Sequence, residues 1–220
     1  MSQSTLSLGR ADQGIELSHA EFAKAYFDEP WRYERVQGRL VVISPADYEH
    51  QCLVERICKV LFRYKDEHPG IVEDVFTAAW FRIDEHPDRI ADIGVFLYFA
   101  RPRMRGLLAV LDKANVSIYP ATGIISKTAS GHLPKRVPEL VMEVVSQESG
   151  DHQRDYVAKR LDYERAGVRE YVIVDRFQRR VTVLHSVRGR FEEHVLAAGK
   201  LYATLLLPGL QIPLMTFIEQ

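Results

Sequence analysis

The sequence is poor in cysteine, has no long apolar run and carries almost no net charge. Its two cysteines, Cys52 and Cys58, are too few for a disulfide framework and are expected as reduced thiols within an apolar stretch. No run of 18 apolar residues occurs, so we expect no membrane-spanning helix and no membrane partner. The first residues are polar and lack an apolar signal core, which favours a cytoplasmic protein. With 29 basic and 30 acidic residues, the formal net charge of −1 indicates no class of partner.

Motifs of several common enzyme classes are absent as well. There is no G-x-S-x-G nucleophile elbow, so Ser126, Ser130 and Ser146 lack the setting of a serine hydrolase nucleophile. Neither H-E-x-x-H nor C-x-x-C occurs, and the eight histidines are scattered, which disfavours a zinc site. Glycine-rich loops that bind phosphate or dinucleotides are also missing. The candidate chemistry must therefore come from carboxylates and basic side chains.

Length and composition are those of one globular domain. Hydrophobic residues make up 46% of the 220 residues and charged residues 27%, so we expect a single domain over residues 1–220. The charge is unevenly distributed, because residues 101–136 contain seven basic side chains and one acidic side chain. We interpret this segment as a basic insertion that could attract phosphate, and a solvated surface is the simpler alternative.

The spacing of apolar residues predicts alternating helices and strands. Ser18 and Glu21 form a capping box for a helix over 18–28, and Gly167 is placed to end a helix over 151–166. Residues 33–36 and 39–43 predict a hairpin that turns at Gln37-Gly38, and a helix follows Ser44-Pro45. Further strands are predicted at 71–76 and 77–83 (as a pair), 90–99, 140–145, 170–174, 180–186, 191–196 and 205–212. The order favours an α/β fold with a mixed β-sheet flanked by helices.

Two acidic residues interrupt the most apolar of these strands. Asp92 lies within 90–99 and Glu143 within 140–145. A carboxylate in a buried strand costs several kcal/mol unless it is paired or binds a metal. We therefore expect the two carboxylates to meet and hold Mg²⁺ or Mn²⁺, which prefer oxygen ligands. The alternative is that each acid points to solvent or pairs with an arginine.

The helix after Glu143 offers a third group. Asp155, Lys159 and Asp162 are spaced so that they share one face of a helix. Lys159 could therefore lie beside the two carboxylates, where an ammonium can polarise a phosphate or activate an attacking water. The alternative is an ordinary surface pair between Asp155 and Lys159.

Five blocks of the sequence resemble the Uma2 (DUF820) family. The most specific block matches D-x3-K-x3-Y-x3-G-V-x-E-Y-W-x-V-D nearly throughout, and the resemblance extends over roughly 17–216. The blocks are residues 36–40, 49–51, 91–93, 138–146 and 155–175. Members of this family are regarded as restriction endonuclease-like proteins of the PD-(D/E)xK nuclease superfamily.

The resemblance implies a role for four residues. Asp92 and Glu143 would be the metal ligands, Lys159 the catalytic lysine, and His50 matches a frequent family histidine with an auxiliary role. The superfamily's lysine usually follows the glutamate by two positions, where this chain has Val145. As in the Uma2 pattern, the lysine here comes from the following helix.

The sequence thus predicts a restriction endonuclease-like α/β protein that hydrolyses DNA phosphodiester bonds with Mg²⁺ or Mn²⁺. A homodimer is expected, because one centre per chain would cut one strand and a twofold axis would supply the second. The alternative is a nucleic-acid-binding or protein-interaction module that kept the fold without catalysis. A purely structural domain would leave the acids in two buried strands unexplained.

Overall fold

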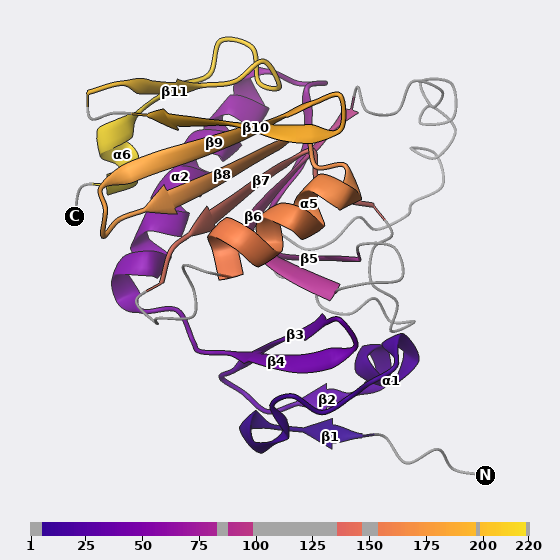
Figure 1. Cartoon of the computed structure of the whole chain (residues 1–220). Coiled ribbons are helices and arrows are strands. Elements are labelled where there is room, and N and C mark those ends of the chain that lie inside the picture. Colours follow the sequence, from indigo (N-terminus) through magenta and orange to yellow (C-terminus); the bar gives the residue numbers. More distant parts are fainter. Residues whose placement is uncertain (1–5, 83–87, 99–135, 147–153, 197–198, 219–220) are drawn as a thin grey trace.

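The structure is a computed structural model that describes residues 6–82, 88–98, 136–146, 154–196 and 199–218. In this part of the chain, eight strands form a central mixed sheet in the order β10-β9-β8-β7-β6-β3-β4, with β5 paired to β6 (Figure 1). β7 and β8 run parallel, and the other neighbours are antiparallel. The strands are β3 (Arg32–Val36), β4 (Arg39–Ile43), β5 (Val72–Arg82), β6 (Asp88–Leu97), β7 (Leu140–Val144), β8 (Glu170–Asp175), β9 (Arg180–Val187) and β10 (Arg190–Leu196).

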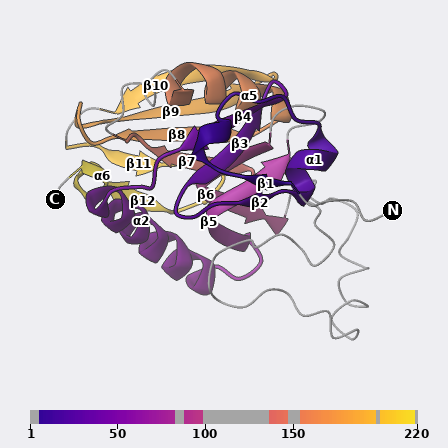
Figure 2. The ribbon, with the colours of Figure 1, turned by 90° about the horizontal axis from the view of Figure 1, so that it is seen from below.

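Helices cover both faces of this sheet, which confirms the predicted α/β fold. Helix α2 (Tyr48–Glu67) lies on one face, and α5 (Arg160–Ala166) lies on the other (Figure 2). Side chains alternate along β7, so Met142 packs in the core with α2 while Val141 packs in the core beside α5. By the same alternation, Glu143 faces the α5 side. No helix in the described ranges combines the length and apolar character needed to cross a membrane.

The local sequence signals place several element ends where they were expected. Ser18 caps α1 (His19–Lys24), and its hydroxyl accepts a hydrogen bond from the backbone N–H of Glu21. The β3–β4 hairpin turns at Gln37 and Gly38, both with positive φ. Gly167 ends α5 in the left-handed conformation, with φ of 80°. α5 continues from η3 (Arg154–Lys159), a π-helical stretch.

Four sequence predictions were wrong in detail. Residues 205–212 do not form one strand, because only their last residues belong to a strand, β12 (Gln211–Pro213), which pairs with β11 (Leu201–Ala203). Residues 71–76 and 77–83 do not pair with each other, because they form the single strand β5, which pairs with β6. The helix predicted over 18–28 already ends at Lys24, because the next residues form β2 (Tyr26–Phe27) parallel to β1 (Ser7–Leu8). Helix α2 begins after Asp47 rather than directly after Pro45, since the Asp47 carboxylate caps its N-terminus.

The apolar face of α2 is buried as its spacing predicted. Leu53, Ile57, Leu61 and Tyr64 are at most 6% exposed and pack against β5, β6, β7 and β8. Both cysteines of this helix are free. Burial raises the pKa of the Cys58 thiol to about 12, so this group behaves as an inert apolar side chain.

The predicted basic segment 101–136 lies outside the described residues except for Arg136. Arg136 pairs with Glu73 and Glu139 and donates to the carbonyl oxygen of Leu97 at 2.8 Å. This arginine therefore helps to fix the start of β7 and is already engaged within the protein. The remaining described elements are η1 (Arg10–Asp12) and α6 (Leu214–Ile218).

A buried carboxylate ties the C-terminal part of the chain to the sheet. Glu170 is 1% exposed at the start of β8. Its oxygens accept hydrogen bonds from the hydroxyl of Tyr202 and, at 2.6 Å, from Thr204 Oγ1. His185 Nδ1 lies 3.0 Å from Glu170 Oε2. The hydrogen bond to Glu170 raises the pKa of His185, although partial burial opposes this.

We expect His185→Gln to destabilise the protein at about pH 5.5 and to have less effect at about pH 8.5. Because the folded-state pKa of His185 is raised, its stabilising contribution is complete below the ordinary histidine pKa and is lost as pH rises through the folded-state value. The side chain is 38% exposed, so solvent screening keeps the effect below about 1 kcal/mol. Urea unfolding at both pH values measures it. The control is His194→Gln, whose ring lies 5.6 Å from that of His185. Equal losses at both pH values would contradict the assignment.

Candidate active site

The two acids predicted to meet come from adjacent strands. β6 and β7 are antiparallel neighbours in which Ile93 pairs with Met142, so Asp92 and Glu143 are brought together. Each carboxylate also contacts the other strand's backbone. The N–H of Val144 donates to Asp92 Oδ2 at 2.9 Å, and the N–H of Asp92 donates to Glu143 Oε2 at 3.3 Å. The side chains are 11% and 2% exposed, so the alternative of solvent-facing acids is wrong.

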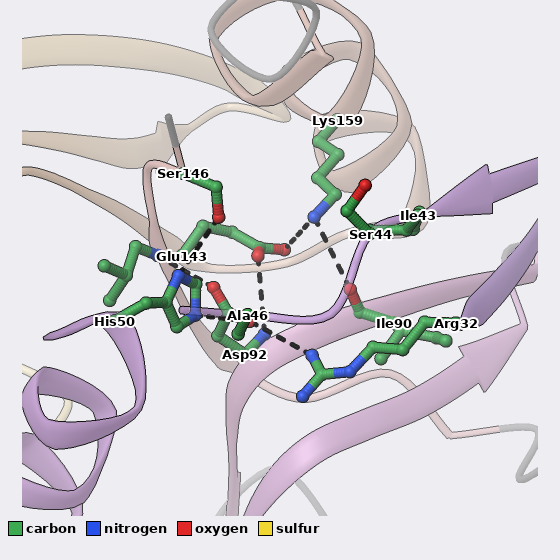
Figure 3. Close-up of a pocket in the computed structure, with 11 residues that line it drawn as sticks. Arg32, Ile43, Ser44, Ala46, His50, Ile90, Asp92, Glu143, Ser146 and Lys159 are labelled. Carbon is green, nitrogen blue, oxygen red and sulfur yellow. Dashed lines mark hydrogen bonds and ion pairs between the residues drawn. The ribbon is translucent and has the colours of Figure 1, made fainter. Parts of the chain in front are cut away.

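Lys159 lies where the sequence predicted it, beside Glu143. Its Nζ is 2.9 Å from Glu143 Oε1 and 3.5 Å from the carbonyl oxygen of Ile90. The side chain is 3% exposed, and it reaches the carboxylates from η3, across the sheet from α2 (Figure 3). The alternative of a surface partner for Asp155 is therefore wrong. The spatial prediction for Asp92, Glu143 and Lys159 is confirmed, and their chemical roles remain predictions.

Tyr163, which was not among the predicted site residues, is a second partner of Glu143. Its hydroxyl donates to Glu143 Oε1 at 2.6 Å, one helical turn after Lys159. Burial and the Glu143 charge raise the pKa of Tyr163 well above its ordinary value, so the phenol stays protonated and acts as a donor. The spacing of Lys159 and Tyr163 places both on one helix face, and this was the available sequence signal.

His50 approaches the same carboxylates from the opposite helix layer. It lies in the first turn of α2, with Nε2 3.2 Å from Asp92 Oδ1 and Nδ1 3.1 Å from Ser146 Oγ. The ring is almost fully buried. Nε2 is not aligned for a hydrogen bond to Asp92, and it has no hydrogen-bond partner among the described residues. The structure therefore brings all four predicted residues into one place.

The charge of Asp92 is fixed by its surroundings. Burial by itself would raise the pKa of this carboxyl group, but adjacent His50, the Lys159 ammonium and the backbone N–H of Val144 stabilise the ionised form more strongly. The pKa of Asp92 thus lies well below its ordinary value. The group is a carboxylate at neutral pH.

These side chains line a small pocket with a volume of about 20 Å³, which is room for a water-sized particle (Figure 3). The hairpin strand β3 contributes Arg32, whose Nη1 lies 3.4 Å from Asp92 Oδ1. Sequence analysis missed Arg32, because it precedes Asp92 by 60 residues and belongs to no periodic pattern. The lining residues are Arg32, Ile43, Ser44, Ala46, His50, Ile90, Asp92, Glu143, Val144, Ser146 and Lys159.

A buried ion cluster lies next to the pocket and joins β3, β6 and α5. We call Glu34, Arg89 and Asp162 the Arg89 cluster. Arg89 is 1% exposed, and its Nη1 is 2.7 Å from Glu34 Oε2 while its Nε donates to Asp162 Oδ2 at 3.0 Å. The other oxygen of Glu34 accepts the N–H of Ile90 at 3.0 Å. The cluster links β3, β6 and α5, and Asp162 is therefore committed to Arg89.

Comparison with known proteins points to one family. The model of the Uma2 family, described as "Putative restriction endonuclease", matches residues 113–215, which include Glu143 and Lys159. The resemblance to the Uma2 family that the sequence indicates is therefore also found by the family model, over these residues. Curated protein sequences give no match to this chain.

A solved structure confirms the fold over nearly the whole chain. It is the crystal structure of a "putative nuclease belonging to DUF820" from Anabaena variabilis ATCC 29413. The similarity covers 91% of this chain and 97% of that chain, with a TM-score of 0.67 and 16% sequence identity. The restriction endonuclease-like α/β architecture expected from the sequence is therefore found. Both relatives carry nuclease descriptions, so the nuclease class is what these comparisons suggest.

Proposed function

We propose that the protein is a metal-dependent endonuclease that hydrolyses phosphodiester bonds of DNA. The observation that carries this proposal is the convergence of Asp92, Glu143 and Lys159 in one pocket, from two strands and a helix. Two carboxylates and one ammonium are the groups needed to hold a divalent cation and to act on a phosphate. The family and the similar structure support the same class of reaction.

The residues of the pocket fit Mg²⁺ or Mn²⁺. Asp92 is an ionised carboxylate, and Glu143 Oε2 lies on its side of the pocket. His50 adds a buried Nε2 that has no hydrogen-bond partner among the described residues. Carboxylate oxygens are the hard ligands that these cations prefer. A cation bound there would stabilise charge on the phosphate and lower the pKa of an attacking water.

The other side chains of the pocket have separate proposed roles. Lys159 and Tyr163 both donate to Glu143 Oε1, so they fix the rotation of the carboxylate and direct Oε2 towards Asp92. The Lys159 ammonium also places a fixed positive charge in a water-poor pocket, where it can orient the attacking water and stabilise the transition state. His50 Nε2 lies 3.2 Å from Asp92 Oδ1 on the side of α2. We further propose a twofold homodimer, in which two copies of the pocket would cut the two strands of a duplex.

The test is cleavage of supercoiled plasmid with Mg²⁺ or Mn²⁺. We expect nicking by the wild type, none with EDTA, and a loss of nicking in Asp92→Asn. Metal binding should also stabilise the folded wild type, by about 1.4 kcal/mol at a tenfold excess over the dissociation constant. Thermal melting measures this gain, which Asp92→Asn should abolish. Asp74→Asn is the control, because Asp74 pairs with Lys65 outside the pocket. A wild type that binds DNA without cutting any DNA or RNA substrate would favour the binding-module alternative.

A further inference from the structure

Arg32 is the cation of the pocket that faces solvent. Its side chain is 37% exposed, whereas those of Lys159 and Glu143 are 3% and 2% exposed. Figure 3 shows its guanidinium entering from the hairpin side, opposite His50. A ligand that arrives from solvent therefore meets Arg32 before it meets Lys159.

The contact between Arg32 and Asp92 is weak for an arginine and a carboxylate. It is a single interaction through Nη1 at 3.4 Å. A guanidinium can instead form two parallel hydrogen bonds with a carboxylate or a phosphate. Arg89 in the same protein uses more of its donors, because its Nε and Nη2 donate to Asp162 Oδ2 and its Nη1 donates to Glu34 Oε2. Arg32 thus has donor capacity that its contact with Asp92 does not use.

In the folded protein, the strand that carries Arg32 is held in place through Glu34. Arg32 and Glu34 are two residues apart on β3, so their side chains leave the same face of the strand. Glu34 is fully buried and fixed by Arg89 and by the N–H of Ile90. Arg32 is therefore presented to the pocket from a fixed backbone, and little entropy is lost when it binds a ligand.

We propose that Arg32 is the phosphate-binding residue of this site, and that a non-bridging oxygen of a nucleic-acid backbone phosphate replaces Asp92 as its partner. The inference rests on the proposed nuclease function. A divalent cation held by Asp92 and Glu143 would compete with Arg32 for the negative charge of Asp92, because both are positive. A phosphate removes this competition, because it offers Arg32 a second negatively charged partner while the cation stays with Asp92.

The experiment measures binding and cleavage separately. Binding of a fluorescent DNA duplex is followed in EDTA over a range of salt concentrations, and cleavage of the same duplex is followed in Mn²⁺. Arg32→Gln should reduce the slope of log affinity against log salt by about one counterion and lower kcat by about 10². Arg32→Lys should keep the salt slope of the wild type, because the positive charge remains. It should recover only part of kcat, because an ammonium cannot form the two parallel hydrogen bonds of a guanidinium. The control is Arg39→Gln on the same hairpin, where the arginine pairs with Glu16 and is 58% exposed.

The outcomes separate this inference from the nuclease proposal. An Arg32-dependent salt slope without cleavage under any metal would support Arg32 as a phosphate ligand and reject the nuclease. Metal-dependent cleavage with an unchanged slope and kcat in Arg32→Gln would support the nuclease and overturn the role of Arg32. A wild type that binds neither duplex nor single strands would also overturn it. Melting curves of each variant show that the fold is intact.

Discussion

Replacing Lys159 with methionine should lower the rate of DNA cleavage by about 10²–10³-fold while DNA affinity stays close to that of the wild type. Methionine keeps most of the stem that packs between the sheet and η3 but removes the ammonium. The loss falls on the rate because a fixed charge beside a phosphate acts mainly where charge develops in the transition state. Single-turnover cleavage with Mn²⁺ and duplex binding in EDTA measure the two effects separately.

The burial of Lys159 requires a stability control. Its Nζ compensates the charge of Glu143, whose side chain is 2% exposed. Lys159→Met removes this ion pair and should therefore also lower the free energy of unfolding. The cleavage assay must therefore be run well below the melting temperature of the variant. Lys59→Met is the matched control, since Lys59 pairs with Glu55 on the exposed face of α2. Cleavage by Lys159→Met at the wild-type rate would reduce the lysine to a structural partner of Glu143.

Replacing Arg89 with methionine should destabilise the protein by about 3–5 kcal/mol. The change leaves Glu34, which is fully buried, and Asp162, whose side chain is 15% exposed, without the cation that compensates them. Such a loss is a large fraction of the total stability of an ordinary domain. Urea unfolding measures it.

The same cluster allows a sharper test of why the loss occurs. If uncompensated charge causes it, replacing Glu34 and Asp162 with leucine in the Arg89→Met background should recover much of the stability, because no buried charge then remains. The control is Arg39→Met, whose exposed pair with Glu16 should be worth less than about 1 kcal/mol. A loss as small in Arg89→Met as in Arg39→Met would mean that water reaches the cluster and compensates the acids.

Local features of the fold were predictable because their causes lie within a few residues. The capping box at Ser18 and the turn at Gly38 depend on hydrogen bonds and backbone angles that neighbouring residues determine. The division of β5 into two strands failed for the opposite reason. Nothing in the local sequence at Phe76 and Thr77 shows that the strand continues, and it is pairing with β6 from Val72 to Arg82 that makes these residues one strand.

The candidate site was likewise predictable only in part. Asp92 and Glu143 could be found because a charge within an apolar strand is anomalous in the sequence itself. Arg32 and the Arg89 cluster could not, because their contacts join residues 55 to 73 positions apart and each residue is ordinary in its own segment. The sequence spacing places Tyr163 on the same helix face as Lys159, but only the fold shows that its hydroxyl donates to the Glu143 carboxylate.

The N-terminal hairpin has an apolar core of its own, which includes Leu8, Phe22, Tyr33 and Leu40 and is separate from the two cores of the sheet. Its strand β3 joins β6 through the pair Arg35–Asp88, the Arg89 cluster and the contact of Arg32 with Asp92, and Trp80 of β5 packs against its core. A unit with a small core and few bridges can open while the rest of the protein stays folded. Amide protons of β3 and β4 should therefore exchange with solvent before those of β7 and β8. Each such opening would remove Arg32 from the pocket while the two carboxylates remain in place, so the hairpin controls how often the site is complete.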